Sequence, residues 1–447
     1  MESLELLPNN LKQWLLETVH SLGVSTEWLP IVSCVLTISP ILLVFPGLFA
    51  LTTVFERKGL GRIQNRYGPN RVGPCGFFQF AADGIKSLTK EDVVPDAADK
   101  LLHFLAPVVL AVPAVLMFSV IPFGKHLVPI EIEAGLLFFF AVGGVAELAI
   151  FMAGWGSRNK YSLLGAMRAI AQMISYEVPL ILAAVVVVMI SGTLNPVEIA
   201  GQQVGDSVVA VFSWNIFSPW GALAGVLFFI AMLAEANRSP FDLPEGESEL
   251  VAGYFTEYSG FKFALFFMAE YLGLFAAMGM GITLFLGGWG APLNAAQLPV
   301  QSLVVGTLSG MVLVGIGGFY WLRRQERFAV TLFAGLGAML AFQPWIPTWV
   351  WFLAKLLLGI FFVIWIRGTM PRIRMDQLMN FAWKFMLPLA LLNILLVGVI
   401  NPGDAPFAIG LVQWLFTISV ILGAWYFLGQ QVAGGEAPKA RRYRYAE

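Results

Sequence analysis

Long apolar runs alternate with short polar segments along the 447 residues of the chain. A membrane-spanning helix needs about 20 consecutive, mostly apolar residues, and ten runs suit that length. They cover residues 31–55, 101–124, 134–155, 165–190, 219–236, 262–287, 300–322, 346–367, 381–400 and 407–429. An eleventh run, 328–343, is so short that its length alone does not show whether it crosses the membrane. The pattern predicts an all-α fold, a polytopic transmembrane helical bundle.

The basic residues indicate whether the short run 328–343 spans the membrane. Short cytoplasmic loops collect Lys and Arg. If this run spans, 24 of the 27 basic residues fall on one side of the membrane. If it does not, the basic group at 367–384 moves to the opposite side. The sequence therefore predicts about eleven spans, with the N-terminus outside and the C-terminus in the cytoplasm.

This topology divides the chain into five parts. They are a surface amphipathic segment (1–30), a six-helix membrane core (31–287) with cytoplasmic loops 56–100 and 236–262, a helical pair (288–345), two further helices (346–400), and a last helix with a basic tail (401–447).

The loop 56–100 carries two local patterns. Its opening is rich in Gly, Pro and Arg, which predicts a bent, ordered loop rather than a helix. Residues 77–92 then place polar and apolar side chains on opposite faces at helical period, which predicts a cytoplasmic amphipathic helix lying along the membrane. A simple surface anchor explains this helix as well as a binding role does.

Composition excludes several classes of protein. The chain is 58% hydrophobic and 12% charged, whereas soluble domains are about a quarter charged, so it is an integral membrane protein. A net charge of −1 gives no basic field for nucleic acid. Two cysteines are too few for an iron–sulfur or zinc site, and we expect no metal. His103 and His126 lie at opposite ends of one apolar run, which excludes paired haem ligands at matched depth.

Four carboxylates inside the apolar runs are the sharpest chemical signal. They are Glu147, Glu177, Glu235 and Glu270. An ionisable group at membrane depth costs ~2.5–3.5 kcal/mol on insertion scales, so such groups are functional candidates. Acids on successive helices are what a proton path requires. The alternative is four isolated acids, each hydrogen-bonded across a helix interface, and four together favour the shared path.

A strongly acidic stretch follows the fifth run, within residues 235–258. It faces a basic segment at 367–384 on the same side of the membrane. The charges that could form ion pairs between these loops are Asp242, Glu245, Glu247, Glu249, Arg238, Arg367, Arg372, Arg374 and Asp376. The alternative is that the arginines only set the orientation of the neighbouring helices in the membrane. Lys355 lies inside an apolar run, where it either snorkels to the surface or pairs with a buried acid.

The end of the first apolar run suggests a ligand cavity. Glu56 and Arg57 close that run and begin the basic loop. With the amphipathic helix nearby, they predict a cavity with apolar walls and a few charges at its mouth, suited to an amphiphile with a polar head and a long apolar tail. The positive-inside rule alone explains the basic residues of this loop but not Glu56.

Several motifs carry a close family resemblance. They are ERKxLGxxQxRxGPNxVGPxG, ADGIKxxxKE, GAMRAxAQMISYE, EANRSPFDLPEGESELVAGYxxEYS, MAEY and RGTMPRxRxDQLM. They occur in family order between about residues 30 and 400, and the chain resembles the H subunit of bacterial NADH:quinone oxidoreductase (respiratory complex I). The resemblance implies a membrane subunit at the joint of the peripheral and membrane arms, which forms much of the quinone-access chamber.

The resemblance also implies roles for residues. The chamber and its entrance would be formed by Glu56, Arg57, Arg66, Asp83 and Lys86. The acidic path would comprise Asp242, Glu245, Glu247 and Glu249 in the loop, with Glu235, Glu270, Glu177 and Glu147 continuing inward. Quinone would be the substrate, while FMN, NADH and iron–sulfur clusters would belong to partner subunits and none to this chain.

The same resemblance gives partners and a location. The partners would be the peripheral-arm quinone-site subunits, small and antiporter-like membrane subunits, and lipids, in a bacterial inner membrane. The family usually has eight helices, so the pair within 288–345 would be an insertion and the last helix an addition.

Two other functions compete with this one. The first is the equivalent subunit of a membrane-bound hydrogenase or another complex-I-like enzyme. The second is a stand-alone ion transporter, which would be expected to show internal repeats with broken helices. No such repeat is visible in the sequence, so we expect a subunit that couples quinone reduction to proton translocation.

Overall fold

The computed structural model describes residues 5–21, 25, 28–204, 210–243, 252–292 and 346–399, with a few positions between 414 and 426. The described chain is helical and contains no strand beyond one isolated bridge. Its α-helices are α2 (Leu7–Ser21), α3 (Leu29–Ile63), α4 (Gln79–Thr89), α5 (Lys100–Leu116), α6 (Gly135–Gly143), α7 (Val145–Gly156), α8 (Lys160–Ser191), α9 (Pro196–Gln203), α10 (Pro219–Glu235), α12 (Gly260–Phe285), α15 (Thr348–Thr369), α16 (Met375–Phe381) and α17 (Leu387–Val399).

Seven helical segments among the described residues are long and apolar enough to cross a membrane. They are Leu29–Ile63, Lys100–Val120, Gly135–Gly156, Lys160–Ser191, Gly260–Phe285, Thr348–Thr369 and Met375–Gly398. Helix α10 is apolar but shorter. These segments fall on the predicted runs and confirm an all-helical membrane bundle. The predicted runs 300–322 and 328–343 lie outside the described residues, as does most of 407–429.

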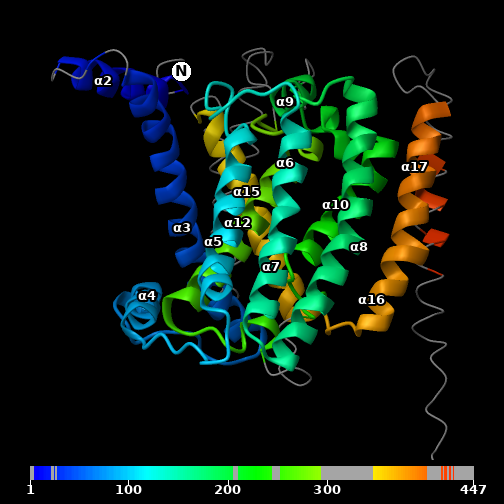
Figure 1. Cartoon of the computed structure of the whole chain (residues 1–447). Helices are drawn as coiled ribbons and strands as arrows, with labels where there is room; N and C mark the ends of the chain where they lie inside the picture. Colours follow the sequence, from blue (N-terminus) through cyan, green and yellow to red (C-terminus); the bar gives the residue numbers. More distant parts are fainter. Residues whose placement is uncertain are drawn as a thin grey trace, which may run out of the picture.

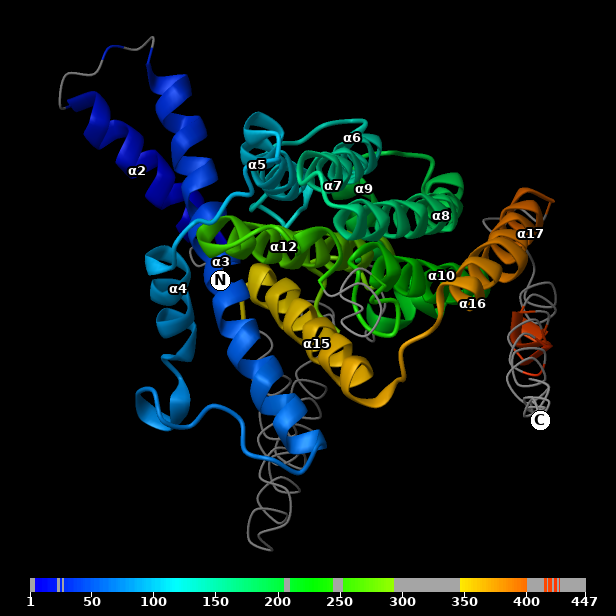
Figure 2. The ribbon, with the colours of Figure 1, turned by 60° about the horizontal axis from the view of Figure 1, so that its bottom comes forward.

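The long helices stand side by side, and α12 occupies the centre (Figure 1). In Figure 2, α12 lies between the row formed by α5, α7 and α8 on one side and α15 on the other. It is the most enclosed of the candidate spans. Helix α3 stands at one edge with α4 across its lower end, and α16 and α17 stand at the opposite edge (Figure 1).

Local sequence signals explain where several helices begin and end. The side chain of Asn159 accepts from the backbone N–H of Tyr161 at 3.0 Å and caps α8, and Asp99 caps α5 in the same way. Helix α8 ends at Gly192, whose φ of 69° is left-handed. Helix α10 starts with Ser218 as its cap and Pro219 as its first residue.

Helix α3 is longer than predicted, and the expectation of a loop from Glu56 onward was wrong. The helix continues to Ile63, about two turns beyond the predicted end. Two glycines in this extension allow close packing: a Cβ on Gly59 would lie 3.3 Å from the side chain of Ile364, and one on Gly61 would lie 3.0 Å from backbone atoms of the following turn. The glycines that suggested a loop permit contact between a helix and its neighbours.

Lys355 takes neither of the two roles that the sequence left open. Its ammonium donates to three backbone carbonyls just beyond α12, those of Leu286 (2.6 Å), Gly288 (2.9 Å) and Gly290 (2.8 Å). It also lies 4.1 Å from the ring centroid of Trp214. Carbonyls at a helix C-terminus lack intrahelical partners and attract cations. Lys355 therefore fixes the end of α12 against α15.

Candidate functional site

A buried carboxylate on α3 joins three helices. Glu56 accepts a hydrogen bond from the hydroxyl of Tyr271 on α12 and an ion-pair contact from the guanidinium of Arg367 on α15. The guanidinium carbon of Arg238, just after α10, lies 3.8 Å from the ring centroid of Tyr271. A buried carboxylate is stable only when charged and hydrogen-bonding partners replace water. In this Glu56 cluster, one cation contacts the carboxylate directly and a second stacks on the tyrosine that donates to it, at the junction of α3, α12 and α15.

A second ion pair lies in the loops next to this cluster. The carboxylate of Asp242 is buried and lies 2.9 Å from the guanidinium of Arg372. The two loops also share a backbone hydrogen bond from Ile373 N–H to the carbonyl of Pro240 at 3.1 Å. The structure therefore brings these two loops together through Asp242 and Arg372. Arg374 and Asp376 lie exposed at the start of α16.

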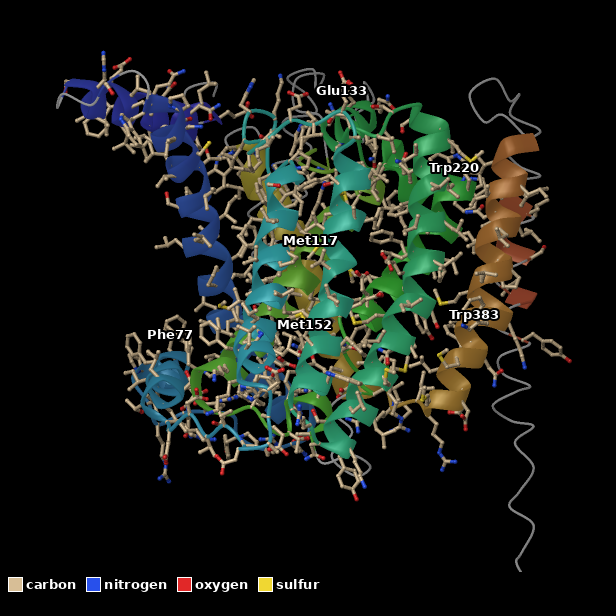
Figure 3. All side chains as sticks on the ribbon, viewed as in Figure 1. Phe77, Met117, Glu133, Met152, Trp220 and Trp383 are labelled. Carbon is tan, nitrogen blue, oxygen red and sulfur yellow. The ribbon has the colours of Figure 1, made fainter. Side chains whose placement is uncertain are left out.

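The entrance residues are only partly brought together. Arg57 on α3 lies 2.5 Å from the carboxylate of Asp83 on α4, which also accepts from Gln79 at 3.0 Å. Arg66 is exposed and donates to Gln64, and Lys86 is exposed on α4. Phe77, just before α4, lies at the lower end of the bundle in Figure 3. Arg57 and Asp83 thus link α4 to α3, while Arg66 and Lys86 stand apart.

Three of the four intramembrane acids form one group, called here the acid cluster: Glu147, Glu177 and Glu235. The carboxyl groups of Glu147 on α7 and Glu177 on α8 lie close enough to share a hydrogen bond, and both act electrostatically on Glu235 at the end of α10. Oε2 of Glu235 is buried and has no hydrogen-bond partner among the described residues. The cluster is a place where carboxyl groups from three helices can exchange a proton.

The break between α6 and α7 lies against this cluster. A Cβ on Gly143 would lie 3.8 Å from Oε1 of Glu235, and one on Gly144 would lie 3.5 Å from Oε1 of Glu177. The predicted single span 134–155 is therefore two helices that meet at these glycines. Glu147 stands in the first turn of α7.

Glu270 has a different partner. Its Oε1 accepts from the hydroxyl of Tyr254 at 2.6 Å, and Tyr254 is completely buried. The structure therefore places Glu270 with a tyrosine from the loop before α12. The predicted path residues Glu245, Glu247 and Glu249 lie outside the described residues.

Sequence reasoning missed several polar side chains of the site. Tyr271 and Tyr254 each donate to a predicted acid. The signal for Tyr271 was its place directly after Glu270 in an apolar helix, and Tyr254 carried no comparable signal. Near the lower end, His103 stacks on Tyr258 with centroids 4.1 Å apart. Burial raises the pKa of the Tyr258 hydroxyl, because the charged phenolate is penalised away from water.

The described residues offer no group of three or more His, Cys, Asp or Glu side chains that could hold a metal ion. Both cysteines are free and exposed. The titratable groups that the structure brings together include the carboxyl groups of the acid cluster and the charged groups of the Glu56 cluster.

Comparison with known proteins assigns the chain to a family. The family model described as NADH dehydrogenase matches residues 36–398. An H subunit of NADH-quinone oxidoreductase from Solibacter usitatus (strain Ellin6076) is 44% identical over 363 residues, covering 77% of this chain and 90% of that protein. The H subunit of the same enzyme from Geobacillus thermodenitrificans (strain NG80-2) is 42% identical over 362 residues, covering 81% and 92%. That from Carboxydothermus hydrogenoformans (strain ATCC BAA-161 / DSM 6008 / Z-2901) is 40% identical over 394 residues, covering 88% and 95%. The chain therefore belongs to the NADH dehydrogenase family, and these relatives carry the name of the H subunit of NADH-quinone oxidoreductase.

Proposed function

We propose that this chain is a membrane subunit of a proton-pumping NADH:quinone oxidoreductase, in which it forms the quinone-access chamber and an acidic path that couples quinone reduction to proton translocation. Membership of the family supports the enzyme. The acid cluster is the observation that supports the coupling role, because it gathers carboxyl groups from three helices at membrane depth.

The flank of the bundle at the acid cluster supports assembly with other membrane subunits. Glu147 and Glu177 are only half-buried. The apolar side chains one turn away on the same helix faces, Phe151 and Ile174, are 37% and 48% exposed. Carboxyl groups facing lipid cost ~2.5–3.5 kcal/mol each, so this flank requires a protein cover. We assign that cover to the neighbouring small membrane subunits, with antiporter-like subunits beyond them. A stand-alone transporter would not need it.

The proposed chamber combines the Glu56 cluster with the apolar surface of α4. Its residues are Glu56, Arg57, Arg66, Asp83 and Lys86. On α4, Ile85 is 63% and Leu88 is 67% exposed, which suits the isoprenoid tail of a quinone. The charged groups on α3 and α15 and the tyrosine hydroxyl on α12 suit its head. The peripheral-arm subunits would close the chamber and hold FMN, iron–sulfur clusters and the NADH site.

We further propose eleven spans, an external N-terminus and a cytoplasmic C-terminus in a bacterial inner membrane, with α4 as a cytoplasmic interfacial helix. Helices α4 and α2 lie at opposite ends of the bundle (Figure 1). Arg57 pairs with Asp83 of α4 and Arg367 pairs with the adjacent Glu56, whereas Lys12 belongs to α2. This asymmetry agrees with the positive-inside rule. In this orientation the acidic stretch, from Glu245 to Glu249 as well as Asp242, faces the cytoplasm.

The test is Glu235→Gln in membranes of the native host, with Glu133→Gln as the control. Glu133 lies just before α6, at the end of the bundle away from Phe77 (Figure 3). Assembly is checked on native gels, and NADH:quinone activity and proton pumping are measured together. We expect the assembled Glu235→Gln complex to lose both activities by at least about tenfold, while Glu133→Gln keeps both. Wild-type activities in Glu235→Gln would remove Glu235 from the coupling path.

A further inference from the structure

One buried amide on α8 holds both sides of the turn that follows α10. Gln172 is completely buried. Its Nε2 lies 2.7 Å from the carbonyl oxygen of Ala234 and 2.6 Å from that of Phe241, with the Asn237 side chain further away at 3.3 Å. An amide nitrogen has two hydrogens, which match the two carbonyls. Ala234 and Phe241 directly precede two proposed path residues, the acids at 235 and 242.

The next turn of α8 contacts α16, the helix that follows the loop of Arg372. The hydroxyl of Tyr176 donates to the carbonyl of Leu378 on α16 at 3.0 Å, and its ring packs against Phe241 with centroids 5.5 Å apart. Residues 172 and 176 are four apart and therefore share a face of the helix. One face of α8 thus contacts the turn that carries Asp242 and the helix that follows the loop carrying its ion-pair partner Arg372.

The same helix carries a member of the acid cluster. Glu177 follows Tyr176 directly and interacts with Glu147 and Glu235. A displacement of the loop at Asp242 therefore meets α8 at Gln172, five residues before Glu177. The carbonyl of Ala234 belongs to the last turn of α10 and also accepts from the backbone N–H of Asn237 at 3.2 Å. Gln172 adds a shorter side-chain hydrogen bond from α8 and so ties the end of α10, and with it Glu235, to α8.

We propose that Gln172 is a positioning residue for the coupling step: it keeps Glu235 in register with Glu177 and ties both to the loop that carries Asp242. This inference rests on the proposed function. A movement of the loop near the quinone chamber then changes the spacing of carboxyl groups in the acid cluster. A side chain that serves folding alone would affect how much complex assembles but not the turnover of each assembled complex.

The experiment compares Gln172→Met with Gln203→Met in the complete complex purified from the native host. Gln203 is a matched control, since it is also buried and its Nε2 donates to the carbonyl of Thr283 at 2.8 Å, at the other end of the bundle. The readouts are kcat for quinone reduction per assembled complex, KM for quinone and proton pumping. We expect kcat and pumping of Gln172→Met to fall together by about tenfold or more, because misplacement by ~1 Å can cost ~100-fold in rate. KM stays unchanged, and Gln203→Met keeps the wild-type kcat.

A second variant, Gln172→Glu, tests the inference if Gln172→Met assembles poorly. Gln172→Glu keeps the length of the side chain, and its carboxyl donates a hydrogen bond only when protonated. The charged residues on the elements around it are Arg168, one turn before it on the same face of α8, Glu177 further along α8, Glu235 at the end of α10, and Arg238 and Asp242 of the turn. We expect its kcat, relative to the wild type at the same pH, to rise as the pH is lowered from about 8 to about 6.

Three outcomes overturn the inference: a wild-type kcat per assembled complex in Gln172→Met, a pH-independent and wild-type kcat in Gln172→Glu, or failure of both variants to assemble, which would limit the amide to folding. The proposed function fails by a different result. If the wild-type chain does not co-purify with flavin- and iron–sulfur-containing partners, the assignment of the subunit is wrong whatever Gln172 does.

Discussion

The pairing of Glu56 with Arg367 gives a prediction whose size follows from burial. The side chain of Glu56 is 8% exposed and that of Arg367 is 26% exposed, so water replaces neither partner easily. Arg367→Met leaves the carboxylate with the hydroxyl of Tyr271 but without this cation. Removing one partner of a buried ion pair costs about 3–5 kcal/mol, whereas replacing both by neutral groups is often close to neutral. We expect Arg367→Met to shift the folding equilibrium of the subunit by on the order of 100-fold or more.

A double-mutant cycle tests this reasoning. The variants are Arg367→Met, Glu56→Gln and both together, and the readouts are the amount of assembled complex on native gels and its thermal inactivation in detergent. The Arg367→Met variant should accumulate poorly, and adding Glu56→Gln should restore most of the assembled complex. Quinone reduction should stay low in the double variant, because both residues belong to the proposed chamber. A double variant that assembles no better than Arg367→Met would refute the view that an uncompensated carboxylate causes the loss.

Three further changes probe other contacts. Gly165→Ala should destabilise the subunit by about 1–3 kcal/mol, since its Cβ would lie 2.6 Å from the backbone of Gly253. Thermal inactivation measures this effect, and an unchanged midpoint temperature of inactivation would contradict the close approach of the two backbones. Lys355→Met should lower the stability of the subunit by about 1–3 kcal/mol, because carbonyls after α12 lose their hydrogen-bond donor. Limited proteolysis of the segment after α12 should then be faster than in the wild type. Equal proteolysis rates in the variant and the wild type would show that Lys355 does not hold this segment. Asp83→Asn should change stability by less than about 1 kcal/mol, because its ion pair with Arg57 is exposed. The same change should raise KM for quinone. An unchanged KM would show that this ion pair does not belong to the chamber entrance.

The hydrophobic pattern was sufficient to predict the helices. Each predicted run up to residue 400 that the structure describes contains a helix, because about 20 apolar residues in lipid must satisfy their backbone hydrogen bonds internally. The family motifs likewise predicted the family, since the matching residues extend over most of the chain. The error at the end of α3 has a local cause. Gly59 and Gly61 suggested a turn, but tertiary contacts with α15 and the next loop use them for close packing.

The sequence by itself therefore determined the class of protein, the positions of the described apolar helices and which ionisable residues lie within them. The tertiary structure alone decided which of these residues meet. In the folded chain, Glu147 and Glu177 lie near Glu235, whereas Glu270 accepts a hydrogen bond from Tyr254. Lys355 donates to backbone carbonyls rather than pairing with an acid. The physical reason is that a partner depends on the rotation and depth of each helix, which packing across the whole bundle sets. Local patterns fix only the face on which a residue stands.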